Sequence, residues 1–136
     1  RRRVLELARE LVELGDPADP SDPSGARALV PRDYEAALAA LAAGLDALRA
    51  YGAEHRGELE GGPDTTAAAA YDRFVEACAA FVATGRAYAA CVGRAPTADG
   101  KVDLATLPRC PGGDRRALTE RYDAFVHTSN ASPFAR

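Results

Sequence analysis

The chain has 136 residues, a net charge of −3 and 27% charged side chains, and its length suits a single domain. The weakly acidic charge gives no electrostatic basis for nucleic acid as a partner. No apolar run approaches the ~20 residues of a membrane-spanning helix and no signal-peptide pattern precedes the first predicted helix, so we expect no direct membrane insertion.

Residues 2–14 predict the first helix, because apolar side chains recur every three or four residues. The stripe consists of Val4, Leu7, Leu11 and Leu14. Gly15 is expected to end this helix. The chain opens on three arginines, Arg1 to Arg3, and contains no Met. We therefore expect an internal piece of a longer protein with a solvated basic end.

Residues 15–30 predict an extended acidic linker. Asp-Pro occurs three times, with prolines at Pro17, Pro20 and Pro23. Proline excludes an interior helix, and it moves the residue before it out of the α region. The three aspartates have nothing to hold them together, so a cation site is not expected here.

Residues 31–59 predict a long helix that starts favourably with Pro31 in its first turn and Asp33 near its positive end. Its apolar side chains follow alternating spacings of four and three, which is typical of a helix–helix seam. This seam contains Tyr34, Leu38, Leu41, Leu45 and Leu48. The same register continues to Gly52 and His55, where it weakens.

Residues 57–64 must turn or bend, because they are rich in glycine and include a proline. The predicted hinge consists of Gly57, Gly61, Gly62 and Pro63. Residues 65–93 predict a second long helix, which Asp64 or Thr65 can cap. Its seam is aromatic, with Tyr71, Phe74, Cys78, Phe81, Gly85, Tyr88 and Val92 at heptad-like spacing. We expect the two seams to pack against each other at a shallow angle.

Residues 94–113 predict a long connection with one turn of structure around residues 103–107. Asp114 can cap a last helix over residues 115–128, whose stripe contains Leu118, Tyr122 and Phe125. No convincing run of alternating strands is present. The prediction is a single all-α domain, residues 1–136. It is an elongated bundle built on two long antiparallel helices with shorter flanking helices, and it is open to domain swapping.

The cysteines and histidines do not form a recognisable chemical motif. There is no CxxC pair, and we expect Cys78 to be a core residue and Cys110 an exposed thiol. The odd cysteine count favours a cytosolic-type compartment. Neither His55 nor His127 is placed beside a cysteine by the sequence. The segment from residue 97 to 103 resembles part of a calcium loop but lacks both anchoring acids. We expect no catalytic residue, no cofactor and no metal.

The composition and the linker style resemble the large tegument protein of alphaherpesviruses. The chain has 31 Ala and 16 Arg but one Lys, and residues 7–31 and 119–134 join helical segments to Asp/Pro/Ser stretches. The resemblance implies a helical stalk between the capsid and membrane-side layers, located in the virion tegument and in host cytoplasm and nucleus. Other tegument or capsid proteins would be its partners. That family also carries a deubiquitinating cysteine protease domain, for which no matching residues are present here.

The supply of large core side chains is thin, because about half of the 47% hydrophobic content is alanine. A slender bundle, or one completed by a second copy, fits this supply better than a thick globule. The first functional hypothesis is therefore a non-enzymatic structural segment that forms a homodimer through its helix seams. The alternative is a small cytoplasmic ligand-binding or regulatory domain from a GC-rich bacterium. Its pocket would be lined by Tyr71, Tyr88 and Tyr122.

Overall fold

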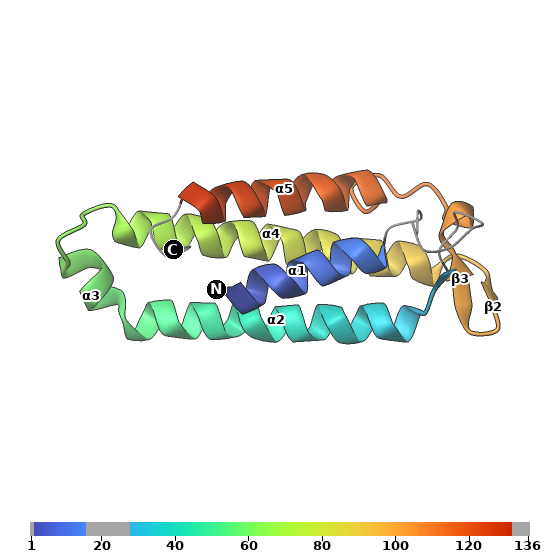
Figure 1. The fold of residues 1–136 in the computed structure, drawn as a ribbon, viewed down its shortest axis with the longest axis horizontal. Helices are drawn as coiled ribbons and strands as arrows, with labels where there is room; N and C mark the ends of the chain where they lie inside the picture. Colours follow the sequence, from blue (N-terminus) through green and yellow to red (C-terminus); the bar gives the residue numbers. More distant parts are fainter. Residues whose placement is uncertain (1, 16–27, 132–136) are drawn as a thin grey trace.

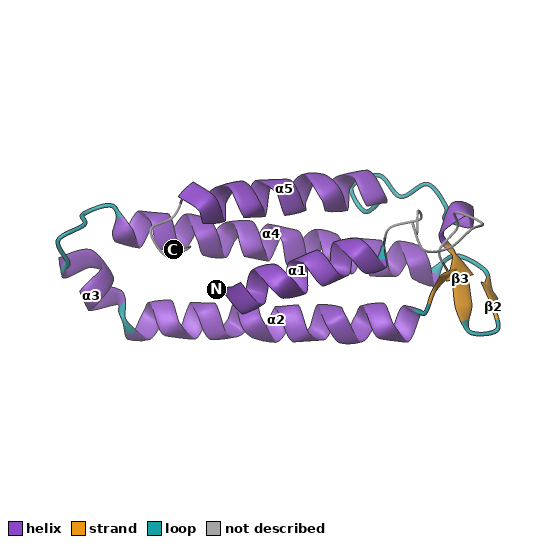
Figure 2. Cartoon of the chain, viewed as in Figure 1, coloured by secondary structure: helices purple, strands orange, loops and turns teal. Residues whose placement is uncertain are grey.

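The computed structural model describes residues 2–15 and 28–131, apart from the side chains of Arg2 and Ala105. This part of the chain is mostly helical, with five helices packed together and a small three-stranded antiparallel sheet (Figure 2). The helices are α1 (Arg2–Leu14), α2 (Pro31–Glu54), α3 (Arg56–Gly61), α4 (Ala67–Gly93) and α5 (Arg115–Ala131).

Four of these helices form a long bundle in which consecutive members run in opposite directions (Figure 1). Helix α2 packs against α1 and α4, and α5 packs against α4 and α1, so the four helices close a ring. The short helix α3 lies at one end of the bundle and the sheet lies at the other. Helix α1 is about half as long as α2 and begins midway along it (Figure 1).

The sheet at the other end corrects the all-α prediction. Its strands are β1 (Ala28–Leu29), β2 (Thr97–Ala98) and β3 (Lys101–Asp103), and β3 lies between the other two and antiparallel to both. Strands of two or three residues are too short to show an alternating pattern in the sequence. The signal that was present is Asp99-Gly100, an Asp-Gly pair typical of a tight hairpin. Both residues have positive φ, 54° and 75°.

The central strand also extends the hydrophobic core. Val102 pairs with Leu29 on one side and Thr97 on the other, and its side chain is fully buried. A short 3-10 helix, Leu104–Thr106, follows directly and confirms the turn predicted in this connection. The sheet therefore closes the end of the bundle at which α2 begins and α4 ends.

Most helix boundaries match the sequence prediction, and the differences are local. Helix α1 has the predicted bounds, α4 begins two residues later than expected, and α5 continues three residues further. The predicted helix over 31–59 is wrong as a single element, because the chain breaks at His55 and restarts as α3. In the predicted linker over 15–30, residues 28–29 form a strand instead, and residues 16–27 lie outside the described residues.

Helix α4 contributes more of the core than any other element described, and its composition reflects this. By length and apolarity alone it is sufficient to cross a membrane, since an 18-residue window has a mean hydropathy of 1.3. The prediction that no segment approaches a membrane span is therefore wrong for α4 as far as length and composition are concerned. Core helices of soluble proteins meet the same criterion, so this composition does not by itself indicate a membrane span.

Candidate functional site: the α2–α4 seam and its α3 connection

The two predicted seams are buried, and their ends lie against each other. Every predicted seam side chain is at most 9% exposed. Near one end, a Cβ added to Gly85 would lie 3.0 Å from Leu38 Cδ1. Near the other end, a Cβ added to Gly52 would lie 2.6 Å from Tyr71 Cε1. The glycines therefore permit α2 and α4 to approach closely at both ends of the seam.

The middle of the aromatic stripe also contacts a helix that the prediction did not name. The rings of Phe74 and Phe81 pack against Phe125 of α5, with centroids 5.3 and 6.4 Å away. Phe81 also meets Tyr122 edge to face at 6.0 Å. The leucine and aromatic seams pack against each other as expected, and the aromatic seam also contacts α5, because α4 is flanked by two helices. Periodicity alone places these rings in the core without saying which helix they face.

A buried tyrosine pair lies at the sheet end of the seam. The rings of Tyr34 and Tyr88 are 5.3 Å apart, and the Tyr88 hydroxyl donates to the Gly15 carbonyl at 3.0 Å. The Tyr34 hydroxyl is buried and has no hydrogen-bond partner among the described residues. Burial, with a smaller contribution from Tyr88, raises the pKa of Tyr34 well above its usual value. Arg115 lies nearby and donates to the Val12 carbonyl, which links α5 to α1.

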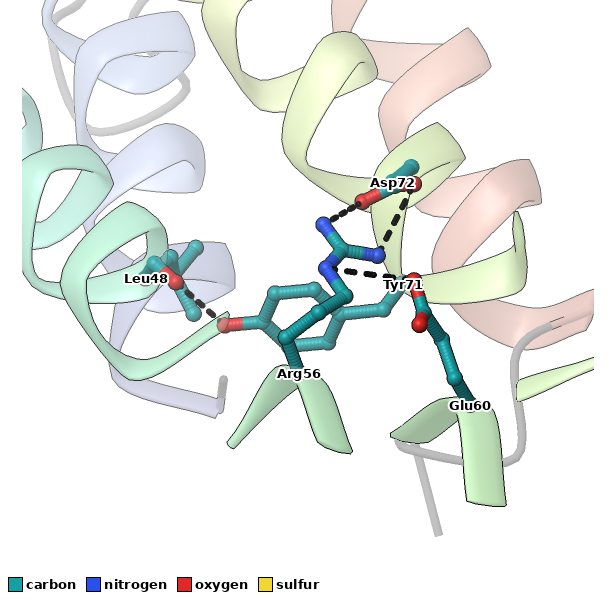
Figure 3. Close-up of polar contacts among 5 residues, drawn as sticks. All are labelled: Leu48, Arg56, Glu60, Tyr71 and Asp72. Atoms are coloured by element: carbon teal, nitrogen blue, oxygen red, sulfur yellow. Dashed lines mark hydrogen bonds and ion pairs between the residues drawn. The ribbon is translucent and has the colours of Figure 1, made fainter. Parts of the chain in front are cut away.

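Side-chain contacts at the opposite end join α2, α3 and α4 (Figure 3). The Arg56 guanidinium of α3 donates to both carboxylate oxygens of Asp72 on α4, at 2.9 and 3.2 Å. Glu60 lies 3.9 Å from the same guanidinium. The Tyr71 hydroxyl of α4 donates to the Leu48 carbonyl of α2. The hydrogen bond and the attraction of Asp72 raise the pKa of Arg56, and the pair remains half-exposed.

The non-helical part of the predicted hinge is shorter than the sequence suggested. Gly57 and Gly61 belong to helix α3, and a Cβ added to either would meet nothing within 4 Å. The non-helical connection to α4 begins at Gly62, which is extended with φ −77° and ψ 175°. Pro63 follows and lacks the N–H that a continuing helix needs. The bend at Gly62-Pro63 lies within the predicted hinge, and the hinge was drawn too long because glycine content does not exclude a short helix.

The residues after this bend fix the start of α4. Asp64 accepts hydrogen bonds from the Thr66 N–H at 2.9 Å and from the Thr66 hydroxyl at 2.6 Å. These two bonds lower the pKa of the Asp64 carboxyl, the hydroxyl contributing most. The predicted capping by Asp64 or Thr65 is wrong, because the N-cap is Thr66 and no described side chain caps the helix. Asp64 instead holds Thr66, the residue just before the helix. The orientation of α4 as it leaves the bend is therefore specified locally.

The structure corrects the account of the cysteines. Cys91 at the end of α4 and Cys110 in the loop before α5 form a disulfide, with their Cα atoms 6.1 Å apart. Cys110 is 4% exposed rather than a free surface thiol. The three cysteines are one disulfide pair and one free thiol. Because the paired cysteines are 19 positions apart, no local sequence motif marks them. Cys78 is fully buried as predicted, and burial raises the pKa of its thiol to about 12.

The three tyrosines of the alternative pocket do not meet. Tyr71 lies at the α3 end of α4 and Tyr88 is 17 positions further on, about 25 Å along a helix axis. Tyr122 is on α5 against Phe81. A groove of about 460 Å³ does adjoin Tyr71, beside the exposed ring of Tyr51. Residues 2–15 and 28–131 hold no group of three or more side chains suited to bind a metal ion.

Comparisons with known proteins give no relative for this chain, so its function is inferred from the geometry of the structure. No protein-family model, curated protein or solved structure is significantly similar to the chain. The features that the structure brings together are a long buried seam between α2 and α4, a short connection at Gly62-Pro63, and a half-exposed ion pair across that connection. These features concern how the helices are held together.

Proposed function

We propose that the chain is a non-enzymatic structural segment that self-associates by exchanging helices between two copies. The observation that carries the proposal is the connection between α2 and α4. It bends at Gly62-Pro63, and the side-chain contacts across it include the Arg56–Asp72 pair, the Tyr71–Leu48 hydrogen bond and the Tyr51–Tyr71 ring contact. Opening there would release two arms without disturbing the packing within either arm.

The swapped form follows from the order of the helices. One arm would contain α1, α2 and α3, and the other would contain α4 and α5. In a dimer, the first arm of one copy would pack on the second arm of its partner through the same seam contacts as in the monomer. Domain swapping of this kind costs little, because it replaces each intramolecular contact by an identical intermolecular one. Glycine at position 62 can adopt many backbone conformations, so the two arms could change their relative direction there.

The wider setting is part of the same proposal. Bundles of this kind would act in series as a stalk, as the resemblance to the large alphaherpesvirus tegument protein implies, with partners among tegument or capsid proteins. Support comes from the Ala- and Arg-rich composition and from a described fold that is mostly helical. The coding sequence on either side of these residues tests it: a reading frame that continues for thousands of residues supports a stalk, and a short frame contradicts it.

Changing the length of the connection tests the exchange directly. A variant that lacks Gly61, Gly62 and Pro63 has too little chain to turn back, so we expect it to be a dimer by light scattering at every concentration. A matched variant has four residues, Gly-Ser-Gly-Ser, inserted after Gly62. Its longer connection relaxes the turn, so it should be a monomer. The unmodified chain should show a dimer fraction that grows with concentration. A shortened variant that stays a folded monomer, or that unfolds without dimerising, would contradict the proposal.

The alternative of a ligand-binding domain retains one supporting observation, the groove beside Tyr51. It is lined by Arg3, Val4, Gly44, Ala47, Leu48, Tyr51 and Tyr71. Tyr51 is the one large hydrophobic side chain among the described residues that is mainly exposed, at 51%. Titration with a fluorescent apolar probe tests this role. Binding that Tyr51→Ser abolishes supports a ligand site, and equal binding to both chains contradicts it.

A further inference from the structure

The Cys91–Cys110 disulfide lies beside a positive charge. Arg94 follows the last residue of α4, one turn beyond Cys91, and its backbone N–H donates to the Cys91 carbonyl at 3.1 Å. Its guanidinium Nη2 lies 3.0 Å from the Cys110 Sγ. A guanidinium at this distance stabilises a thiolate, because an opposite charge within a few ångströms favours the ionised form. The two sulfurs of the bond are therefore not equivalent.

The loop that carries Cys110 has little regular structure to hold it closed. Residues 107–110 are neither helix nor strand, and prolines on both sides of residues 109–110 cannot donate backbone hydrogen bonds. The neighbouring side chains Pro108, Arg109 and Pro111 are exposed, although both cysteines are buried. Segments with few backbone hydrogen bonds open locally without global unfolding. A small movement of this loop would uncover the disulfide.

We propose that Cys91–Cys110 is a thiol–disulfide exchange site that a dithiol reductant cleaves, with Cys110 as the leaving group. A thiolate of the reductant attacks Cys91 Sγ and forms a new S–S bond there. The Cys91–Cys110 bond breaks, and its electron pair stays on Cys110 Sγ beside Arg94. The second thiol of the reductant loses its proton and attacks its own bonded sulfur, which releases Cys91. The reductant is oxidised to a disulfide, and both cysteines end as thiols after proton uptake.

This assignment fits a protein that works in a reducing compartment. Disulfides in cytosolic proteins are usually transient, and they serve catalysis or redox sensing. Cleavage here would free the connection between α4 and α5, since the bond closes the segment that carries β2 and β3. The redox state of the surroundings would then control how firmly α5 is tied to the end of the bundle. The inference does not depend on the proposed exchange of helices.

Cys78 provides an internal control for the experiment. It is the free cysteine of the chain and is fully buried, so its alkylation requires the core to open. The folded protein is treated with dithiothreitol and iodoacetamide, and labelling of each cysteine is followed by peptide mass spectrometry. We expect Cys91 and Cys110 to be labelled much faster than Cys78. Equal labelling rates at all three positions would show that cleavage requires global unfolding, and would overturn the proposal.

The direction of attack is tested with glutathione, which leaves a mixed disulfide that can be located. We expect the adduct on Cys91. Arg94→Gln should slow cleavage about threefold or more, the effect of one pKa unit at a Brønsted slope near 0.5. Arg94→Lys should restore most of the rate. Arg86→Gln, an exposed arginine two turns earlier on α4, is the matched control. An adduct on Cys110, or equal rates for Arg94→Gln and Arg86→Gln, would overturn the role of Arg94.

Discussion

Arg56 and Asp72 join the short helix α3 to the start of α4 through two parallel hydrogen bonds, at 2.9 and 3.2 Å. Bidentate pairing of this kind fixes the orientation of the guanidinium as well as its distance. The side chains are 40% and 49% exposed, so solvent screens their attraction. Their contribution is therefore expected to be greater for the geometry of the bend than for the free energy of unfolding.

The first prediction concerns this pair. Arg56→Gln should leave the melting temperature nearly unchanged and should raise the rate at which subunits exchange in a mixture of two mass-labelled chains. The reason is that the pair must break for the arms to separate, whereas the buried seam dominates overall stability. Native mass spectrometry gives the rate from the appearance of mixed dimers.

The matched control for this experiment is Arg116→Gln. Arg116 pairs with Glu120 at 3.1 Å within α5, so this ion pair does not connect two helices. It should leave the exchange rate unchanged. Equal exchange rates for the two variants would rule out the Arg56–Asp72 pair as a contact that holds the bend closed.

The second prediction compares two helical glycines. Gly52→Ala should destabilise the protein by about 1 kcal/mol or more, because the added methyl group would collide with the Tyr71 ring. That ring cannot easily move, since it is buried and its hydroxyl donates to Leu48. Gly57→Ala meets no neighbour and should stabilise by up to about 1 kcal/mol through helix propensity. Urea unfolding of both variants measures the difference, and stabilisation by Gly52→Ala would contradict the close approach.

The helices were predictable because their side chains repeat with helical spacing over many residues. This is why α1 and the start of α2 match the predicted bounds, and why the predicted seam residues are buried. Two- and three-residue strands carry no periodic signal, so the sheet was missed although Asp99-Gly100 marked its hairpin. The disulfide was missed for a related reason. It depends on how the loop before α5 folds back on the end of α4, which no local pattern records.

The third prediction concerns the buried tyrosine pair. Tyr34→Phe removes a buried hydroxyl that has no partner among the described residues, and should raise stability by about 1 kcal/mol. Tyr88→Phe removes the donor to the Gly15 carbonyl and should lower stability by about the same amount. Each change deletes one hydroxyl group, and the two rings contact each other. Comparing the free energies of unfolding of the two variants by chemical denaturation therefore distinguishes a hydrogen-bonded hydroxyl from an unbonded one. Destabilisation by both variants would show that the Tyr34 hydroxyl has a partner.

The fourth prediction is a pH dependence that arises at the start of α4. Hydrogen bonds from Thr66 lower the pKa of Asp64 in the folded protein below its unfolded value of 3.8. The group therefore contributes stability that is present above pH 3.8 and is lost as the pH falls through the folded pKa. Asp64→Asn keeps an acceptor oxygen but does not titrate in this range. The difference in melting temperature between the two chains should be constant near neutral pH and should change below about pH 4. A difference that stays constant down to pH 2 would contradict it.

The fifth prediction concerns the stability that the disulfide supplies. Cys91 and Cys110 are separated by 19 positions, and closing a loop of this length restricts the unfolded chain by about 3 kcal/mol in the entropic model. The double variant Cys91→Ala, Cys110→Ala should lose about this amount and should no longer respond to dithiothreitol. The unmodified chain should lose a similar amount when reduced, while its helix content stays the same.

The same measurement separates two roles for the bond. If reduction lowers stability but Cys78 stays unlabelled, the bundle persists without its tie and the disulfide can act as a switch in the folded protein. If the reduced chain is unfolded, the bond is structural, and the seam between α2 and α4 cannot by itself hold the fold. The thin supply of large side chains makes this comparison informative, because about 3 kcal/mol is a large part of the stability of a small domain. We expect the bundle to persist, since the core at the α3 end lies far from the bond and is held by the Tyr71–Leu48 and Phe74–Phe125 contacts.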